Sequence, residues 1–388
     1  MKITKSEIVS FFVLAIVFVL FITSQGLNKH ENQSQDKAKD IAYDIAEAAK
    51  LAHMDMEDNE TVTFTENSYF DGNDANHGPF ILTIDRYENT IMDMWVDNTY
   101  CVRKQIDGTE FVIDENVTSE NGCLNKTIDV NELLYNYDLI EDSDSTGADY
   151  YNSFASKNYY AGIDPSNYVV FSNSCFRILN ITTNNYLKLV YEGEVNEDNT
   201  CSVSKASGYV DEKPWDESGS NNWNRPATLN TLFKVWHTDD NVNNVIKSLN
   251  SKKLVVPIWY IGSLSNTDST SLVDIISSER SAISESYYNL GLLSISDYIK
   301  ASSNTNCQNL KFNEQTTCSQ DNYLIKDYES WLFDTVDSNK NSAFTLDKDG
   351  VVALKSTKKE FKIRPVIYLS NNVTLTGSGR STSPYIVK

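Results

Sequence analysis

Six cysteines constrain the fold of this chain more than any other feature, because they occur as three pairs whose members are close along the sequence. The pairs are Cys101 with Cys123, Cys175 with Cys201, and Cys307 with Cys318. Other pairings are possible in principle, but each near pair lies within one apparent structural unit. We therefore expect three local disulfides, each of which would stabilise the fold by roughly 3 kcal/mol in the loop-entropy model.

The same cysteines indicate where the chain functions. An even number of cysteines that follows an N-terminal hydrophobic segment is typical of a protein in an oxidising compartment. A zinc site is the alternative, but no two cysteines form C-x-x-C and no two histidines stand at the spacing of zinc ligands. The sequence therefore predicts an extracellular protein stabilised by disulfides.

The N-terminus predicts a membrane anchor within residues 1–24. Two lysines precede an apolar run from Ile8 to Ile22, whose length falls between that of a signal-peptide core and a full membrane span. Extended by two residues, the run predicts a single pass through the lipid bilayer by residues 8–24, with the lysines on the inner side. Cleavage at Ser24-Gln25-Gly26, a loose small-x-small site, is the alternative and would give a secreted protein.

Residues 25–128 predict a helix followed by a small antiparallel sheet. In "DKAKDIAYDIAEAAKLAHMD", which begins at Asp36, alanine and isoleucine recur at helical spacing, and acidic residues occupy the rest of the surface. From residue 60 to 128 the sequence alternates with the period of a strand. We expect the sheet to pack on the helix as a small β-rich head.

This order of elements resembles the plan of type IV pilins and pseudopilins, in which a hydrophobic N-terminal helix continues into an Ala-rich amphipathic helix and a small head. Glu7 occupies a place comparable to that of the acidic residue which stands before the apolar run in that family. No Gly-Phe pair precedes Glu7, which is a departure from the family pattern. The resemblance covers residues 1–128 and implies a structural subunit with filament partners.

Residues 129–158 predict an acidic linker, because the stretch is rich in Asp and Glu and carries no basic residue before Lys157. From residue 159 onward the pattern changes to strands joined by Asn-rich turns. A short helix is expected in "SISDYIKAS", with Ser294 or Ser296 as its cap. The second large domain is therefore expected over residues 159–388.

The order of motifs in this second domain resembles a domain of unknown function that is widespread in surface proteins of gut Firmicutes and related Bacilli. The matching motifs are Arg177-Ile178, Gly291–Tyr298, Trp331–Leu332, Arg364–Leu369 and Pro384-Tyr385. That family is in turn similar to the C-type-lectin-like fold of formylglycine-generating-enzyme relatives. The resemblance implies a C-type-lectin-like α+β domain with Arg177, Arg364 and Pro365 as structural signature residues.

Pro365 interrupts "KIRPVIYLS", which otherwise has the alternation and bulk of a strand. Because proline has no N–H for a central ladder, we expect Pro365 at a sheet edge or a bulge, and Arg364 held by a buried carboxylate or by carbonyl groups. The predicted fold class is α+β: a transmembrane and amphipathic helix with a small antiparallel β head, followed by the C-type-lectin-like domain.

Charge and motif patterns disfavour several functions. A net charge of −21 argues against a nucleic-acid partner, since phosphate binding depends on clustered Lys and Arg. No G-x-S-x-G elbow occurs and the four histidines lie in dissimilar settings, so no catalytic residue is predicted. No cofactor and no metal ligand is predicted, and loosely held calcium is the alternative left open.

Ligand binding is the function that the sequence favours. The stretch "DEKPWDESGSNNWNRP" is polar around Trp215 and Trp223, and a loop that displays aromatic residues is a candidate binding site. We therefore predict a membrane-anchored extracellular surface protein with a non-catalytic binding or adhesion domain for a glycan, protein or wall ligand. The alternatives are a minor pilin or pseudopilin subunit and, less favoured, a formylglycine-generating-type enzyme with copper bound by Cys307 and Cys318.

Overall fold

A computed structural model describes most of the chain. The described residues are 33–54, 61–73, 77–85, 87–104, 110–124, 127–135, 138–142, 154–225, 227–236, 247–265, 269–285, 288–311 and 317–388. The chain divides into two compact units. The first comprises Met1–Val62 and Phe70–Cys123, and the second comprises Thr63–Tyr69 and Leu124–Lys388.

The predicted anchor, residues 8–24, lies outside the described ranges, and so does Glu7. Within those ranges, no helix is both long enough and apolar enough to cross a membrane. The single-pass topology therefore stays a prediction.

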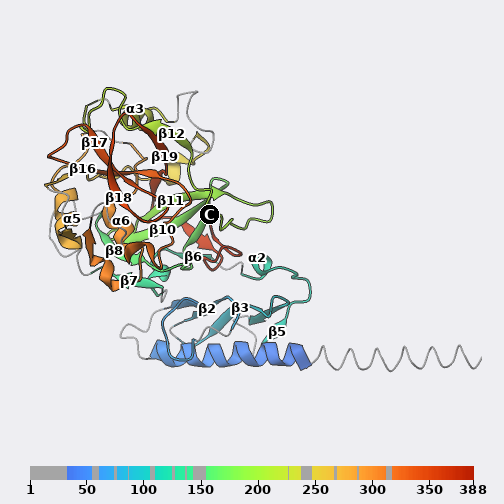
Figure 1. Ribbon diagram of the computed structural model, residues 1–388. Coiled ribbons are helices and arrows are strands. Elements are labelled where there is room, and N and C mark those ends of the chain that lie inside the picture. Colours follow the sequence, from blue (N-terminus) through green and yellow to red (C-terminus); the bar gives the residue numbers. More distant parts are fainter. Residues whose placement is uncertain are drawn as a thin grey trace, which may run out of the picture. The chain divides into compact units, whose positions relative to one another are not determined.

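The first unit combines one long helix with an antiparallel sheet (Figure 1). The helix spans residues 33–54 and buries a stripe of small and apolar side chains at helical spacing. These are Ala38, Ala42, Ile45, Ala46 and Ala49. Small side chains let other segments approach the helix closely, since a Cβ on Gly72 would lie only 2.9 Å from Ala48.

The five-stranded sheet has the order β1-β2-β3-β4-β5, and its strands β2 to β5 belong to this unit. Its strands, and the short helix α2 that follows them, are β1 (Val62–Thr65), β2 (Phe80–Ile84), β3 (Thr90–Val96), β4 (Tyr100–Lys104), β5 (Val112–Ile113) and α2 (Glu120–Cys123). The Cys101–Cys123 disulfide joins β4 to α2 and packs against Trp95. A covalent bond therefore holds α2 on the sheet.

The second unit contains two large sheets and one small sheet. The nine-stranded sheet has the order β20-β11-β10-β9-β22-β21-β6, with β8 paired to β10 and β7 paired to β8. The six-stranded sheet has the order β12-β19-β16-β17-β18, with β13 paired to β16, and the small sheet pairs β14 with β15. The strands are β6 (Thr127–Asp129), β7 (Leu139–Glu141), β8 (Ser156–Tyr160), β9 (Tyr168–Phe171), β10 (Ser174–Thr182), β11 (Leu187–Glu194), β12 (Asp211–Pro214), β13 (Ser263–Leu264), β14 (Ser269–Ser271), β15 (Asn309–Lys311), β16 (Ser330–Val336), β17 (Ser342–Leu346), β18 (Val352–Ser356), β19 (Glu360–Ile363), β20 (Val366–Leu369), β21 (Thr374–Thr376) and β22 (Tyr385–Val387).

The helices described in this unit are short. They are α3 (Thr228–Lys234), α5 (Leu272–Glu279) and α6 (Ile295–Lys300), with single 3₁₀ turns η1 (Glu132–Tyr135), η4 (Ser251–Lys253), η5 (Thr305–Gln308) and η6 (Thr317–Ser319). Serine side chains cap two of these helices, because Ser271 accepts from Asp274 N–H at the start of α5 and Ser294 accepts from Asp297 N–H at the start of α6. The cap at Ser294 is one of the two that the sequence predicts.

Arg364-Pro365 is the point at which the chain passes from one large sheet to the other. β19 ends at Ile363 in the six-stranded sheet, and β20 begins at Val366 at the end of the nine-stranded order. Pro365 lies between the two strands, where its missing N–H removes no ladder bond. Its carbonyl accepts a hydrogen bond from Tyr191 N–H at 3.0 Å. Pro365 therefore lies where the chain crosses from one sheet to the other, and not at the edge or bulge that the sequence predicts.

The predicted fold class, α+β with a C-type-lectin-like domain, is wrong. Among the residues that the structure describes, strands dominate and form several sheets. β10 and β16 are buried along their whole length, which is expected of strands in the interior of a β protein rather than of strands with one solvated face. The chain is mostly β-sheet.

The predicted linker, residues 129–158, is also wrong where the structure describes it. β7 pairs with β8 and β8 pairs with β10, so this segment extends the nine-stranded sheet. Its acidic residues hold turns and ion pairs: Asp129 accepts from Asn131 N–H at 2.7 Å, and the buried Asp142 pairs with Lys300. Composition alone does not distinguish acids of this kind from those of a solvated linker.

Two further disulfides lie in the second unit. Cys175–Cys201 and Cys307–Cys318 close sequence separations of 26 and 11 residues. With Cys101–Cys123 they use all six cysteines in the three local pairs. Because disulfides persist in oxidising surroundings, they indicate an extracellular or secreted protein.

Candidate functional site

The two tryptophans that the sequence offers for ligand binding do not lie on an open loop. Trp215 is 0 % and Trp223 is 3 % exposed, and their rings pack together at 5.1 Å. Trp223 also packs on Phe333 at 4.7 Å and donates its indole N–H to the Tyr288 hydroxyl. The two rings are therefore not displayed on a loop. Burying large aromatic side chains in a shared cluster stabilises the fold, and the polar residues next to them in sequence do not reveal this packing.

The signature arginines are buried as well. The Arg177 guanidinium lies between two tyrosine rings, at 3.7 and 4.7 Å from their centroids. Arg364 donates from Nη1 to the Leu324 carbonyl at 2.7 Å, and its Nη2 lies 3.9 Å from the Glu192 carboxylate. Both arginines therefore link segments of the second unit that are distant in sequence.

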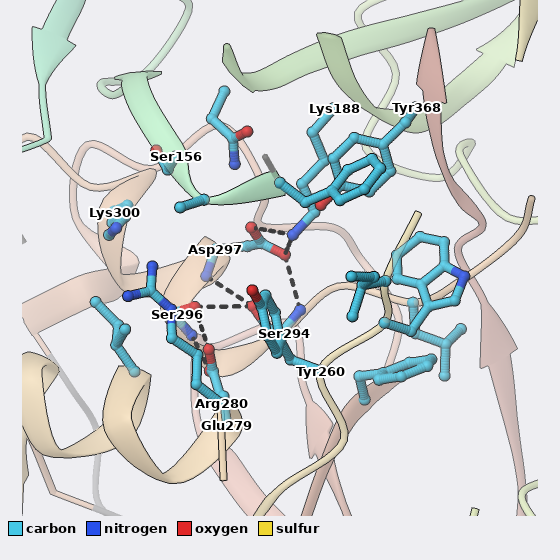
Figure 2. Close-up of a pocket in the computed structure, with 18 residues that line it drawn as sticks. Ser156, Lys188, Tyr260, Glu279, Arg280, Ser294, Ser296, Asp297, Lys300 and Tyr368 are labelled. Atoms are coloured by element: carbon cyan, nitrogen blue, oxygen red, sulfur yellow. Dashed lines mark hydrogen bonds and ion pairs between the residues drawn. The ribbon is translucent and has the colours of Figure 1, made fainter. Parts of the chain in front are cut away.

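A cavity of about 70 Å³ is the better candidate for a binding site (Figure 2). Strands β8, β10, β11 and β20 of the nine-stranded sheet supply one side of it. Helices α5 and α6, with residues 258–260, supply the other side. The volume suits a chemical group of a few heavy atoms.

The sheet side of the cavity is a row of three residues on neighbouring strands. Asn180 of β10 lies opposite Lys188 of β11, and Lys188 lies opposite Tyr368 of β20. Residues directly opposite in an antiparallel pair point to the same face of a sheet. Ser156, at the start of the adjoining β8, also lines the cavity.

Asp297 ties this row to helix α6. Its carboxylate accepts from Ser294 N–H at 2.9 Å in a capping box, and both of its oxygens lie 2.7 Å from Lys188 Nζ. Burial alone would lower the pKa of Lys188, but the Asp297 carboxylate more than offsets this and holds that pKa above its ordinary value. The charged Lys188 ammonium therefore holds the helix start against the sheet through Asp297, as Figure 2 shows.

Two further carboxyl groups lie at the start of the same helix. Glu279 accepts from Ser296 N–H at 2.9 Å and from Ser296 Oγ at 2.6 Å, while Asp334 accepts from Ile295 N–H at 2.8 Å. Burial raises the pKa of both groups, and the charge of Glu279 raises that of Asp334 further. The pKa of Asp334 is raised well above its ordinary value, and the nearby Glu279 charge adds to this effect, so Asp334 is the member of the pair that favours the protonated form.

Asp334→Asn is expected to remove a pH dependence of stability. A carboxyl whose pKa is raised by folding stabilises the fold fully below its unfolded pKa, and this contribution is lost as pH rises through the folded pKa, at about 1.4 kcal/mol per pH unit crossed. Asparagine reproduces the protonated acid, so the variant should become more stable than the wild type as pH rises from about 5 to about 8. Urea unfolding at both pH values measures this.

Asp337→Asn is the matched control, since Asp337 pairs only with the exposed Lys340 among the described residues. Its difference from the wild type should not change with pH. A constant difference for Asp334→Asn would show that Asp334 is ionised in the fold.

Aromatic side chains close the remaining wall of the cavity. Trp259 packs on Phe333 at 5.7 Å and on Tyr368 at 5.5 Å, and it donates from Nε1 to the Tyr288 carbonyl at 3.0 Å. A Cβ on Gly291 would clash with the Trp259 ring, so this glycine makes room for the indole. The wall offers apolar contact beside the polar row.

Three lining residues have unused hydrogen-bonding or ionic capacity. Ser156 and Asn180 are 9 % and 7 % exposed, and Ser156 Oγ and Asn180 Oδ1 have no hydrogen-bond partner among the described residues. Arg280 lies 5.9 Å from the ring centroid of Tyr260 but has no ion pair with any carboxylate in the described part of the chain. Buried polar groups normally have partners, so this site is suited to a ligand.

The arrangement suits binding rather than covalent chemistry. The Ser296 hydroxyl is held by a carboxylate that is itself engaged with Asp334, and Lys188 is a charged partner of Asp297 and not a free amine. Over the ranges described above, no group of His, Cys, Asp and Glu side chains could hold a metal ion.

Sequence reasoning missed this site, although two signals for it were present. Lys188 is a charged residue among the apolar residues Leu187, Leu189 and Val190 of its strand, and a buried charge requires a partner. Ser294-x-x-Asp297 is a capping box, which places an acidic side chain at a helix start. Neither signal identifies Lys188 and Asp297 as partners, because 109 residues separate them.

No protein-family model, curated protein or solved structure that was compared with the chain matches it. The function is therefore argued from the chemistry of the site.

Proposed function

We propose that this protein is a membrane-anchored extracellular surface protein whose second unit binds an N-acetylated glycan without catalysing a reaction. Residues 8–24 would anchor it in the bilayer. The three disulfides support a place outside the cell. The motif resemblance of residues 159–388 to bacterial surface proteins supports the same location.

The observation that carries the glycan proposal is the match between the cavity and an acetamido group. Such a group has an N–H donor, a carbonyl acceptor and a methyl group. Among the described residues, Ser156 Oγ and Asn180 Oδ1 are acceptors without a hydrogen-bond partner and Arg280 is a cation without an ion pair. Trp259 offers an apolar face. The volume of about 70 Å³ takes the substituent, while the sugar ring would remain at the mouth of the cavity.

Calorimetric titration of the full chain in detergent micelles tests this proposal. N-acetylglucosamine should bind, and glucosamine and glucose should bind at least about tenfold more weakly, because they lack the acetyl group. Arg280→Ala should weaken N-acetylglucosamine binding by about tenfold, since it removes the cation that faces the carbonyl.

Arg225→Ala, at an exposed arginine outside the cavity, is the control and should bind as the wild type does. Equal binding of N-acetylglucosamine and glucose, or an Arg280→Ala variant that binds normally, would refute the proposal.

A further inference from the structure

A second cavity lies in the same unit and has a volume of about 450 Å³. It shares no lining residue with the cavity described above. Arg177, Glu192 and Lys326 line it, and these side chains are 2 %, 3 % and 4 % exposed. Buried charges therefore form part of its wall.

The buried charges around this second cavity are unbalanced. Lys326 Nζ lies 2.5 Å from Glu192 Oε1, and Arg364, at 1 % exposure, lies 3.9 Å from Glu192 Oε2. The buried Glu192 carboxylate is thus the ion-pair partner of two buried cations, Lys326 and Arg364. Arg177 is a third buried cation. Arg177 pairs with Asp164 at 3.4 Å, whose side chain is 56 % exposed, and it also donates to Asn167 Oδ1 and to the Pro165 carbonyl. An uncompensated buried charge is costly, so the cluster is suited to additional negative charge.

Several atoms of this charged cluster also lack a hydrogen-bond partner among the described residues. Glu192 Oε2 and the Nε and Nη2 atoms of Arg364 have no hydrogen-bond partner in the part of the chain that the structure describes. Burial lowers the pKa of the Lys326 ammonium to about 8, and the Glu192 carboxylate offsets only part of that effect. A second negative charge beside Lys326 would hold the ammonium in its charged form.

The rim of the second cavity carries exposed apolar side chains, a lysine, and the exposed carboxylates of Asp164 and Asp321. Ile163 and Val203 line it although they are 71 % and 62 % exposed, and Ile325 lines it from a more buried position. Lys205 also lines it, is exposed, and has no ion pair among the described residues. Cations on the floor and apolar side chains at the rim match a molecule with an anionic end and an apolar body.

We propose that this second cavity binds the carboxylate end of an organic acid with an apolar body. The carboxylate lies against Lys326 and Arg177, and the apolar body contacts Ile163 and Val203. A free peptide C-terminus and a simple aliphatic acid share this chemistry. The site is independent of the glycan site, because no residue is common to both cavities.

Calorimetric titration of the full chain in detergent micelles with N-acetyl-Ala-Ala as the free acid and as the amide tests the proposal. The free acid should bind, and the amide should bind at least about tenfold more weakly, because only the acid carries the charge. Butyrate distinguishes the two sources: weaker binding of butyrate supports a peptide terminus, and equal binding supports a simple acid. Equal binding of acid and amide, or no saturation by either at about 10 mM, would overturn the proposal.

Two variants with opposite expected effects separate a binding role from a folding defect. Lys326→Met should weaken binding of the free acid by about tenfold, because it removes a cation. Glu192→Gln should strengthen it several-fold, because it removes the carboxylate that repels the ligand. Lys340→Met, at an exposed lysine, and Arg280→Ala, at the glycan site, should leave binding of the acid unchanged. Weaker binding by Glu192→Gln would contradict the proposed role of the cluster.

Discussion

Lys188→Met is expected to lower the free energy of unfolding by about 3–5 kcal/mol, because it leaves Asp297 as a buried charge without its partner. The side chains of the pair are 12 % and 5 % exposed, so water does not replace the lost ammonium. Since Asp297 also caps α6, the start of that helix should loosen with it. Urea unfolding followed by tryptophan fluorescence measures the loss.

Two further variants identify the cause of that loss. Lys340→Met removes an exposed lysine that is paired with Asp337 at 3.3 Å, and it should change stability by no more than about 0.5 kcal/mol. Lys188→Met combined with Asp297→Asn removes both charges but keeps an oxygen for the Ser294 N–H, so it should recover most of the lost stability. If the double variant were as unstable as Lys188→Met, packing and not charge would be the cause.

Removing the Cys175–Cys201 disulfide by Cys175→Ser with Cys201→Ser is expected to lower the free energy of unfolding by about 3.5 kcal/mol. The bond closes a sequence separation of 26 residues, and the opened loop restores conformational entropy to the unfolded chain. The bond also packs against Tyr168 and Val170, so its loss would also leave a packing defect. Chemical unfolding without a reducing agent measures the effect.

The other disulfide of the second unit is the matched comparison. Cys307–Cys318 closes a separation of 11 residues, so replacing both cysteines by serine should cost about 0.8 kcal/mol less than removing Cys175–Cys201. A larger loss for the shorter loop would show that local packing outweighs loop entropy. Unchanged stability in both double variants would contradict a structural role for these bonds.

Local features of the fold could be predicted from sequence, and non-local ones could not. The cysteine pairs and the Ser294 cap depend on residues near one another in the chain, and the structure has both. The order of strands depends on contacts across hundreds of residues, such as the pairing of β6 with β21. Resemblance suggested the wrong fold class there, and composition suggested a linker where strands occur.

The functional site could not be predicted from the sequence for the same reason, because it depends on contacts between distant segments. The polar surroundings of Trp215 and Trp223 indicated a displayed loop, yet both rings are buried. Trp223 packs on Phe333, which lines the cavity. The residues that line the cavity come from five strands, two helices and the segments between them, all in the second unit. Each is an ordinary residue in its own segment, and only the register of the strands places Asn180, Lys188 and Tyr368 in one row.

A crystal structure of the protein with N-acetylglucosamine would show directly whether the cavity binds an acetamido group. We expect the acetamido group inside the cavity, with its N–H within hydrogen-bond distance of Asn180 Oδ1 or Ser156 Oγ and its carbonyl facing Arg280. A sugar bound elsewhere while this cavity holds only water would contradict it.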